Sequence, residues 1–171
     1  MKLDYIYEVL LFAVLILLQV LLFNQISVFG FATPFLYIYF LLKLPVGRNV
    51  FYVIIMGFLM GLIIDIFLNT PGINATALTI VATFRHSMLR LFYAKEEFED
   101  YVPSIYSASA PFIKFSILAV TIHQTVLYGL EAFSLFNPEI LFFRWLSSII
   151  LTLILIFALD GFMFKAFAAN E

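Results

Sequence analysis

Two glycines and one carboxylate inside an apolar stretch form the most regular set of candidate functional residues in this sequence. Gly57, Gly61 and Asp65 recur at a spacing of four, so they share one face of a helix. Small residues at this spacing allow a second helix to approach closely, and a carboxylate in apolar surroundings needs a partner. The set therefore predicts a helix-packing or partner-binding face that ends in a negative charge.

A tight turn follows this face directly. Residues 69–74 read Asn-Thr-Pro-Gly-Ile-Asn, a composition typical of turns. The backbone N–H groups of the turn and the Asn74 side chain are available to the Asp65 carboxylate, so one interpretation is that Asp65 caps the turn. The other interpretation is that Asp65, Pro71, Gly72 and Asn74 shape a binding site, and the two roles are compatible.

His123 and Gln124 form a second polar site, near the middle of a later apolar stretch. A histidine in such surroundings is a candidate functional residue by default. The simpler interpretation is a neutral imidazole that hydrogen-bonds to a serine or threonine of a neighbouring helix. Thr121 and Thr125 indicate that this stretch is moderately polar.

The composition indicates where these residues lie. The chain has 171 residues, of which 64% are hydrophobic and 12% are charged, whereas an average soluble domain has about 25% charged residues. Because so few charges cannot cover a water-facing surface, the sequence predicts an all-α polytopic membrane protein with a single membrane domain over 1–171. We expect six transmembrane helices, the second one short, over residues 5–23, 34–44, 50–68, 73–92, 111–136 and 140–164.

The distribution of basic residues predicts the orientation. If all six segments span, both termini and the even-numbered connections lie on one side, together with most of the lysines and arginines. The connections on the other side, near 27–33, 69–74 and 131–139, contain neither lysine nor arginine. Because short cytoplasmic loops are enriched in these residues, the pattern predicts cytoplasmic termini. Loss of the second span would destroy the pattern, which supports a count of six.

Four further residues are expected at the membrane interfaces. Arg85 and His86 lie toward the cytoplasmic end of the fourth segment, where a long side chain can extend to phosphate and water. Arg144 and Trp145 lie near the outer start of the sixth segment, and tryptophan is enriched at headgroup depth. We therefore expect these four side chains to be interfacial.

The sequence offers no positive support for catalysis. Asp160 lies near the cytoplasmic end of the last segment, where a local ion pair with Lys165 is expected, while Asp65 lies near the outer face. Across a ~30 Å hydrocarbon core the two carboxylates are about 20 Å apart, but a catalytic carboxylate pair needs roughly 5–10 Å. The chain has no cysteine, and its two histidines lie on different helices. We therefore expect no enzyme activity, no metal site and no cofactor.

The net charge of -2 leaves no large basic surface for nucleic acid.

One stretch carries a more specific pattern. Residues 57–65 read Gly-Phe-Leu-Met-Gly-Leu-Ile-Ile-Asp, and residues 69–78 read Asn-Thr-Pro-Gly-Ile-Asn-Ala-Thr-Ala-Leu. The arrangement resembles the signature of the rod shape-determining protein MreD family, in which a G-x-x-x-D helix leads through a short turn to G-x-[HN]-A. Two positions depart from the common pattern: many members carry an acid where this chain has Phe35, and many carry a histidine where it has Asn74.

The resemblance implies a non-enzymatic scaffold subunit of the bacterial cell-elongation machinery, which serves rod shape and peptidoglycan synthesis at the inner membrane. Members of this family associate with the single-pass protein MreC and, directly or through MreC, with a RodA-type glycosyltransferase and its transpeptidase partner. On this hypothesis the face that ends in Asp65, together with the turn after it, forms the outer end of a groove for partner helices.

The same resemblance supplies an alternative function. The fold of the MreD family is similar to that of the substrate-binding S-components of energy-coupling-factor vitamin transporters. Many S-components dock their coupling subunit through an A-x-x-x-A pattern on the first helix. That pattern is absent here, because Ala13 is the only alanine of the first apolar segment.

Overall fold

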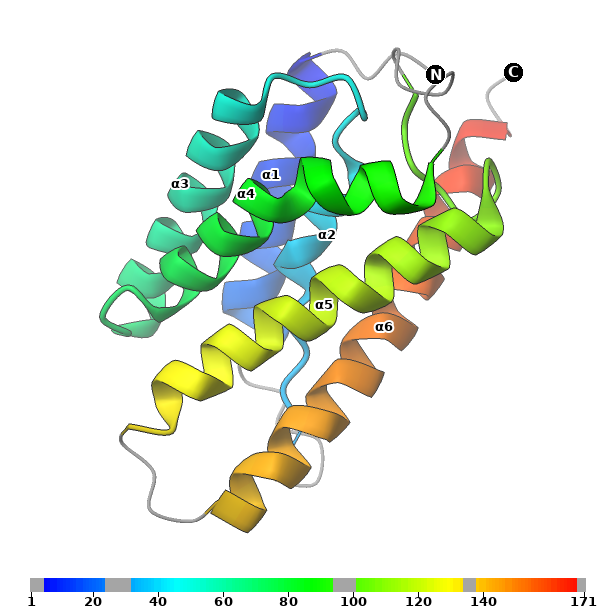
Figure 1. Ribbon diagram of the computed structural model, residues 1–171. Coiled ribbons are helices and arrows are strands. Elements are labelled where there is room, and N and C mark those ends of the chain that lie inside the picture. The colour runs from blue at the N-terminus through cyan, green and yellow to red at the C-terminus, as the bar shows by residue number, and fades with distance from the viewer. Residues whose placement is uncertain (1–4, 24–31, 94–100, 134–137, 169–171) are drawn as a thin grey trace.

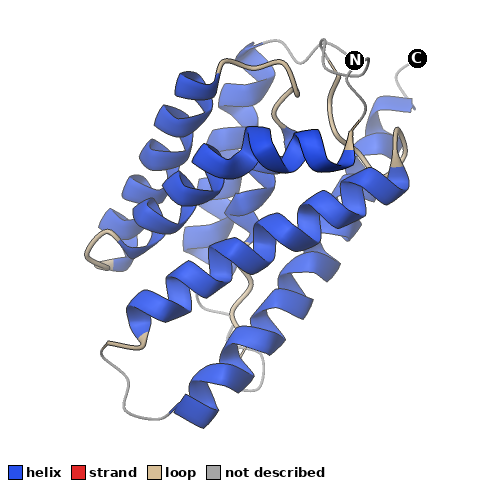
Figure 2. Ribbon diagram, in the orientation of Figure 1, coloured by secondary structure: helices blue, strands red, loops and turns tan. Residues whose placement is uncertain are grey.

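The computed structural model in Figure 1 consists of helices joined by turns and loops, and it describes residues 5–23, 32–93, 101–133 and 138–168. No strand appears among the helices and loops of this part of the chain in Figure 2. The helical elements are α1 (Tyr5–Leu18), the π-helical turn η1 (Gln19–Phe23), the 3₁₀ turn η2 (Leu36–Ile38), α2 (Tyr39–Lys43), α3 (Val50–Leu68), α4 (Ile73–Phe92), α5 (Ser109–Glu131) and α6 (Pro138–Ala168).

Four stretches of this structure are long and apolar enough to cross a membrane, namely Tyr5–Phe23, Val50–Leu68, Ser109–Glu131 and Glu139–Met163. Large apolar side chains face outward from them, among them Leu10 of α1, Phe67 of α3 and Phe143 of α6. An outward apolar surface is stable against lipid and unfavourable against water. The chain is therefore a multi-pass membrane protein with an all-helical fold.

Several predicted helix bounds coincide with the observed ones. The predictions of 50–68 and 73–92 match α3 and α4, and 5–23 matches α1 together with η1. The fifth and sixth helices each begin two residues earlier than predicted, because proline fits the first helical turn, where its missing N–H would have no partner. α5 ends at Glu131 rather than at 136, and residues 134–136 lie outside the described part.

The helices form two antiparallel pairs around a central segment. Figure 1 shows α3 beside α4 and α5 beside α6, while α1 lies behind α2. α1 begins and α6 ends at the same end of the molecule. We call this the basic end, because Lys43, Arg48, Arg85 and Arg90 lie toward it; the turn between α3 and α4 lies at the opposite end.

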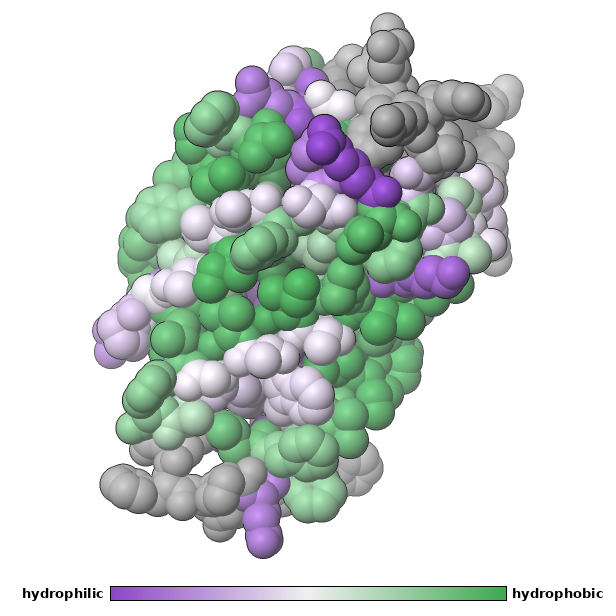
Figure 3. All heavy atoms as spheres, viewed as in Figure 1, coloured by the Kyte–Doolittle hydropathy of each residue, from purple (hydrophilic) through white to green (hydrophobic). Residues whose placement is uncertain are grey.

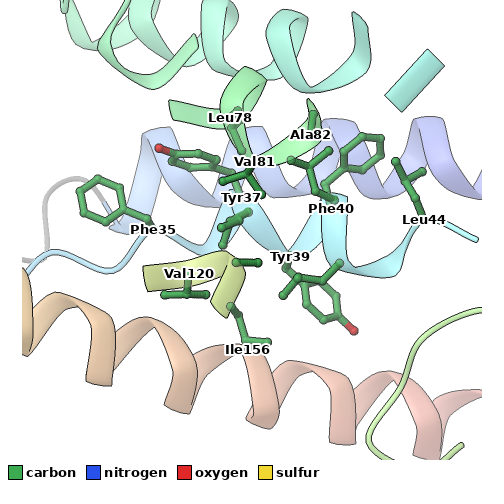
Figure 4. Packing of buried hydrophobic residues seen from close by; sticks show 14 of the residues in the cluster. Phe35, Tyr37, Tyr39, Phe40, Leu44, Leu78, Val81, Ala82, Val120 and Ile156 are labelled. Carbon is green, nitrogen blue, oxygen red and sulfur yellow. The ribbon is translucent and has the colours of Figure 1, made fainter. Parts of the chain in front are cut away.

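The short second segment is the core of the protein. Every residue from Pro34 to Val46 is buried, and Ile38, Tyr39, Phe40, Leu41 and Leu42 are fully inaccessible. In Figure 4 this segment lies between Val81 and Ala82 of α4 on one side and Val120 and Ile156 of α5 and α6 on the other. The segment is apolar because it contacts protein on all sides, whereas the outer helices are apolar because they face lipid.

Glycines of α3 set the close approach of α3 to α4. A Cβ atom on Gly61 would lie 2.4 Å from the Cα of Ala75, and one on Gly57 would lie 3.1 Å from the Cβ of Ala82. The backbone of α4 therefore occupies the space that a side chain at Gly61 would need. The sequence analysis predicted that the face of Gly57, Gly61 and Asp65 forms part of a groove for partner helices. In this structure α4 of the same chain covers that face, so no such groove is present there.

Replacing Gly61 by alanine should lower the free energy of unfolding in detergent by about 1–3 kcal/mol, because the added methyl group must displace the α4 backbone. Gly129→Ala in α5 is the matched control, since a Cβ there meets nothing within 4 Å and the gain in helix propensity is about 1 kcal/mol. Thermal unfolding can be followed by the fluorescence of Trp145, the only tryptophan. Equal melting temperatures for the two variants would contradict the close contact.

Candidate functional site

Asp65 belongs to α3 but caps the N-terminus of α4. The residue that precedes α4 is Gly72, which has no side chain to accept a hydrogen bond. Asp65 Oδ1 accepts from the backbone N–H of Asn74 at 3.1 Å, and Oδ2 accepts from that of Ala75 at 2.8 Å. These N–H groups have no acceptor within α4, and a negative charge is favourable at the positive end of the helix dipole.

Side chains of the turn complete the surroundings of this carboxylate. Thr70 donates its hydroxyl to Asp65 Oδ1 at 2.5 Å, and Asn74 Nδ2 donates to the same oxygen at 2.9 Å. The turn itself uses the left-handed conformation at Asn69 and Gly72. Pro71 is exposed and contributes no bond to the carboxylate. Asp65 therefore has the capping role, the first of its two interpretations, with four donors supplied by its own chain.

A relay of hydrogen bonds connects this cap with the centre of the protein. The Tyr37 hydroxyl donates to Asn74 Oδ1 at 2.6 Å and lies 3.0 Å from His123 Nε2. Because a phenol has one hydrogen and Asn74 Oδ1 can only accept, His123 must donate from Nε2. A charged imidazolium would need a second acceptor at the buried Nδ1, and none lies among the described residues, so the ring is neutral with its proton on Nε2. Asp65, Asn74, Tyr37 and His123 form one chain of hydrogen bonds across four helical elements.

The non-helical residues before η2 are held by side chains from the outer helices. Gln19 of η1 donates to the Pro34 carbonyl at 3.0 Å and accepts from the Leu36 N–H at 2.9 Å. On the other side Thr33 and Phe35 donate their N–H groups to hydroxyls of α6, which belong to Ser148 and Thr152 at 3.0 and 3.1 Å. Buried backbone groups outside a helix are costly when they lack such partners.

Gln124 takes part in this second network and not in the relay. Its Nε2 donates to Thr152 Oγ1 at 2.9 Å, so it supports the same hydroxyl that accepts from Phe35. His123 and Gln124 are both fully buried, but they point toward different elements. His123 Nδ1 and Gln124 Oε1 are buried acceptors with no hydrogen-bond donor among the described residues. These two atoms lie beside the broken second segment, where additional donors could be bound.

Arg85 corrects a prediction. The sequence indicated a side chain that extends to the membrane interface, but Arg85 is buried and turns inward. Its Nε donates to the Leu41 carbonyl at 2.7 Å, and its terminal nitrogens contact the carbonyls of Leu44 and Pro45. The reason is that α2 ends inside the protein, where its last carbonyls have no helical donor. A cation from α4 supplies these donors.

Asp160 also differs from its predicted arrangement. Instead of a local pair with Lys165, whose side chain lies outside the described part, it forms an ion pair with Lys43 at 2.7 Å. Asp160 also accepts hydrogen bonds from Tyr39, Ser104 and the Ile105 N–H, each at 2.8 Å. The carboxylate therefore joins α2, α6 and the loop before α5 at the basic end.

The remaining predicted interfacial residues lie at the surface. His86 is half-buried on α4, and Arg144 is half-buried with its guanidinium 4.0 Å from Glu131. Trp145 donates its indole N–H to Thr125 at 3.2 Å. Arg144 and Trp145 join α6 to α5 at the end opposite the basic end.

Four residues of the site were missed by the sequence analysis: Gln19, Tyr37, Ser148 and Thr152. Gln19 is an isolated amide inside the first apolar segment, and Ser148 and Thr152 are four residues apart on α6. Both patterns were available as signals of polar partners inside the membrane. Tyr37 had no such signal, because a tyrosine in an apolar stretch is equally typical of an interface.

Comparisons with known proteins identify no relative of this chain. No family model, no curated protein and no solved structure matches this chain. Among the described residues, no group of three histidines, aspartates or glutamates is arranged to hold a metal ion.

Asp65→Asn should lower the free energy of unfolding by about 2–3 kcal/mol, because the amide replaces one acceptor by a donor that faces the N–H of Ala75 or Asn74. Glu139→Gln provides the control, since it removes the same charge from an exposed position in the first turn of α6. Thermal unfolding in one detergent compares both variants with the wild type. A loss no larger than that of the Glu139 variant would show that the cap does not stabilise the fold.

Tyr37→Phe should destabilise the protein by about 1–3 kcal/mol, because it leaves Asn74 Oδ1 without its donor and His123 Nε2 without its acceptor. Tyr5→Phe is the comparison, since Tyr5 is 62% exposed and the substitution keeps its ring contact with Arg48. Addition of His123→Ala to Tyr37→Phe should cost less than His123→Ala alone, which a double-mutant cycle measures. Strict additivity would mean that the relay does not couple the two side chains.

Proposed function

We propose that this protein is a non-enzymatic scaffold subunit of a bacterial cell-elongation machinery, similar to the MreD family. The observation that carries the proposal is the contact between α3 and α4. The residues on which the resemblance rests, Gly57, Gly61, Asp65, Asn74 and Ala75, meet in one connected unit there. We call this unit the α3–α4 clamp. A motif whose residues act together in one unit supports the resemblance more than scattered matches would.

The path of the second segment supports a topology with six crossings. The residues from Ala32 to Lys43 comprise a non-helical stretch, η2 and α2. With rises of about 3.3, 2.0 and 1.5 Å per residue for these conformations, the stretch reaches up to about 27 Å, close to a ~30 Å core. The segment thus crosses partly without a helix, which is tolerated where the backbone is enclosed by protein.

In this topology α4 is the fourth crossing, with 20 residues but fewer apolar side chains than the other long helices. Both termini and the basic end then lie in the cytoplasm, and the α3–α4 clamp lies at the outer face of the inner membrane. The support for this orientation is the location of Lys43, Arg48 and Arg90 toward one end.

The scaffold acts through contacts with other membrane proteins. The connections that the structure describes throughout, residues 44–49 and 69–72, are short, so recognition relies on the sides of the helices and on short flanking segments. We propose an MreC-like single-pass protein as the direct partner. A RodA-type glycosyltransferase and its transpeptidase partner join directly or through that protein.

A second candidate function is a substrate-binding subunit of an energy-coupling-factor vitamin transporter. One observation favours it: His123 Nδ1 and Gln124 Oε1 are buried acceptors beside a broken helix. Discontinuous helices often contribute ligand sites in membrane transporters, because their free backbone and nearby polar groups face the substrate. This candidate requires a coupling subunit and a pair of ATPases as partners.

Purification of the tagged protein from its native membranes in a mild detergent distinguishes the two candidates, with the associated proteins identified by mass spectrometry. For the scaffold we expect an MreC-like protein and a RodA-type glycosyltransferase, each enriched over untagged membranes. Enrichment of paired ATPases with a membrane coupling subunit would contradict the scaffold and support the transporter.

A further inference from the structure

The outward face of α4 differs from the outward faces of α1, α3 and α6. Thr76, Thr79, Thr83, His86 and Arg90 recur at spacings of three, four, three and four, so they form one line along the helix. We call this line the α4 seam. Thr76, Thr83 and Arg90 are exposed, and Thr79 and His86 are half-buried. The seam therefore lies on the surface over more than three turns of α4.

On α1, α3 and α6 the exposed surface is dominated by large apolar side chains, whereas α5 exposes Lys114, Thr125 and Gly129 beside Ile117. Leu17 of α1, Ile66 of α3 and Ile154 of α6 are each more than half exposed. In Figure 3 pale and purple residues follow α4 between the green residues of the surrounding surface. Lipid-facing positions favour apolar side chains, so the hydroxyl residues of this line set α4 apart from α1, α3 and α6. Arg90 itself lies toward the basic end, where a long cationic side chain reaches the membrane interface.

The geometry of the seam suits a second helix. The hydroxyls of Thr76, Thr79 and Thr83 donate to the carbonyls of Gly72, Ala75 and Thr79 at 2.7, 2.6 and 2.8 Å. The acceptors belong to α4 or to Gly72, the residue that precedes it, so the threonine side chains lie close to their own helix. They therefore protrude little from its surface. Hydroxyl residues of this kind line helix interfaces in membranes, where backbones approach closely.

The spacing also predicts how such a helix would cross. Alternating intervals of three and four residues are the a and d positions of a heptad. Two helices that meet along these positions cross at about 20° with a left-handed twist. One helix can then contact the whole seam from Thr76 to Arg90.

The charge at the end of the seam selects the occupant. In a symmetric pair of two copies within one membrane the two-fold axis lies along the membrane normal, so the Arg90 side chains of both copies would lie at the same depth. Close to that axis, two like charges repel each other. The favoured occupant is a helix of another protein that carries a carboxylate at the depth of Arg90.

We propose that the α4 seam is the docking site for the single transmembrane helix of the partner protein, with small or hydroxyl residues at heptad spacing and an acidic residue opposite Arg90. The inference rests on the proposed scaffold function and names the surface that this function uses. It assigns the partner to α4, and not to the α3 face that the sequence favoured.

Site-specific photo-crosslinking in native membranes tests the contact. A benzophenone side chain at Thr83 should form an adduct with the co-expressed, tagged single-pass partner, and the cross-linked peptide should lie in the transmembrane helix of that partner. The same probe at Ile154 of α6, which is 58% exposed, is the control and should yield no such adduct. Adducts with a second copy of this chain, or with lipid only, at Thr83 would overturn the proposal.

Substitution tests the energetics in the same membranes. Thr83→Leu should reduce the recovered partner about tenfold, or about 1.4 kcal/mol, although leucine favours insertion into lipid. Ser147→Leu is the matched control, because Ser147 is a half-buried hydroxyl residue on α6 that also bonds to its own helix, at 2.7 Å from the Phe143 carbonyl. Arg90→Glu should reduce recovery by a similar factor, and an acid-to-lysine change in the partner should restore it.

The outcomes separate this inference from the proposed function. If the wild-type protein recovers the single-pass partner but Thr83→Leu recovers as much as Ser147→Leu, the seam is not the docking site and the scaffold function stands. If the wild-type protein recovers no such partner, the scaffold function itself fails, and the assignment of the seam fails with it.

Discussion

Inside a membrane protein every backbone N–H and C=O group needs a partner, and the second segment is where this requirement is hardest to meet. Its residues before η2 are buried without helical hydrogen bonds. Gln19, Ser148 and Thr152 supply the partners from η1 and α6. At the other end of the segment Arg85 contacts the last carbonyls of α2. The positions of α1, α4 and α6 around the core follow from these contacts.

The distribution of polar and apolar side chains is inverted with respect to a soluble protein. α1, α3 and α6 present large apolar residues, and buried polar side chains such as Gln19, Asp65 and Asp160 are paired with one another or with backbone groups. Lys43 and Asp160 form a buried ion pair that joins α2 to α6 near the basic end. Loss of either partner alone would leave an uncompensated buried charge, which is strongly destabilising. The polar contacts therefore specify which helices meet, while apolar packing fills the space between them.

The candidate site connects one end of this arrangement with its centre. The α3–α4 clamp closes at the end opposite the basic end, and the relay through Tyr37 links it to His123 on α5. α4 thus has three roles on three faces: Gly57 and Gly61 of α3 cover one, the second segment covers another, and the seam faces outward. A helix fixed so firmly on two faces offers a rigid third face, which is a suitable base for the recognition of another helix.

The sequence by itself determined the membrane class and the bounds of α3 and α4, and it offered the cap of Asp65 on the following turn as one of two compatible interpretations. These features depend on composition, on helical periodicity and on contacts between residues at most ten apart, such as Asp65 with Ala75. Only the tertiary structure decided that the second segment is the core, that Arg85 points inward and that His123 meets Tyr37. The last two residues are 86 positions apart in the chain. Periodicity shows which residues share a face, but the neighbour of each face depends on long-range packing, which no local pattern encodes.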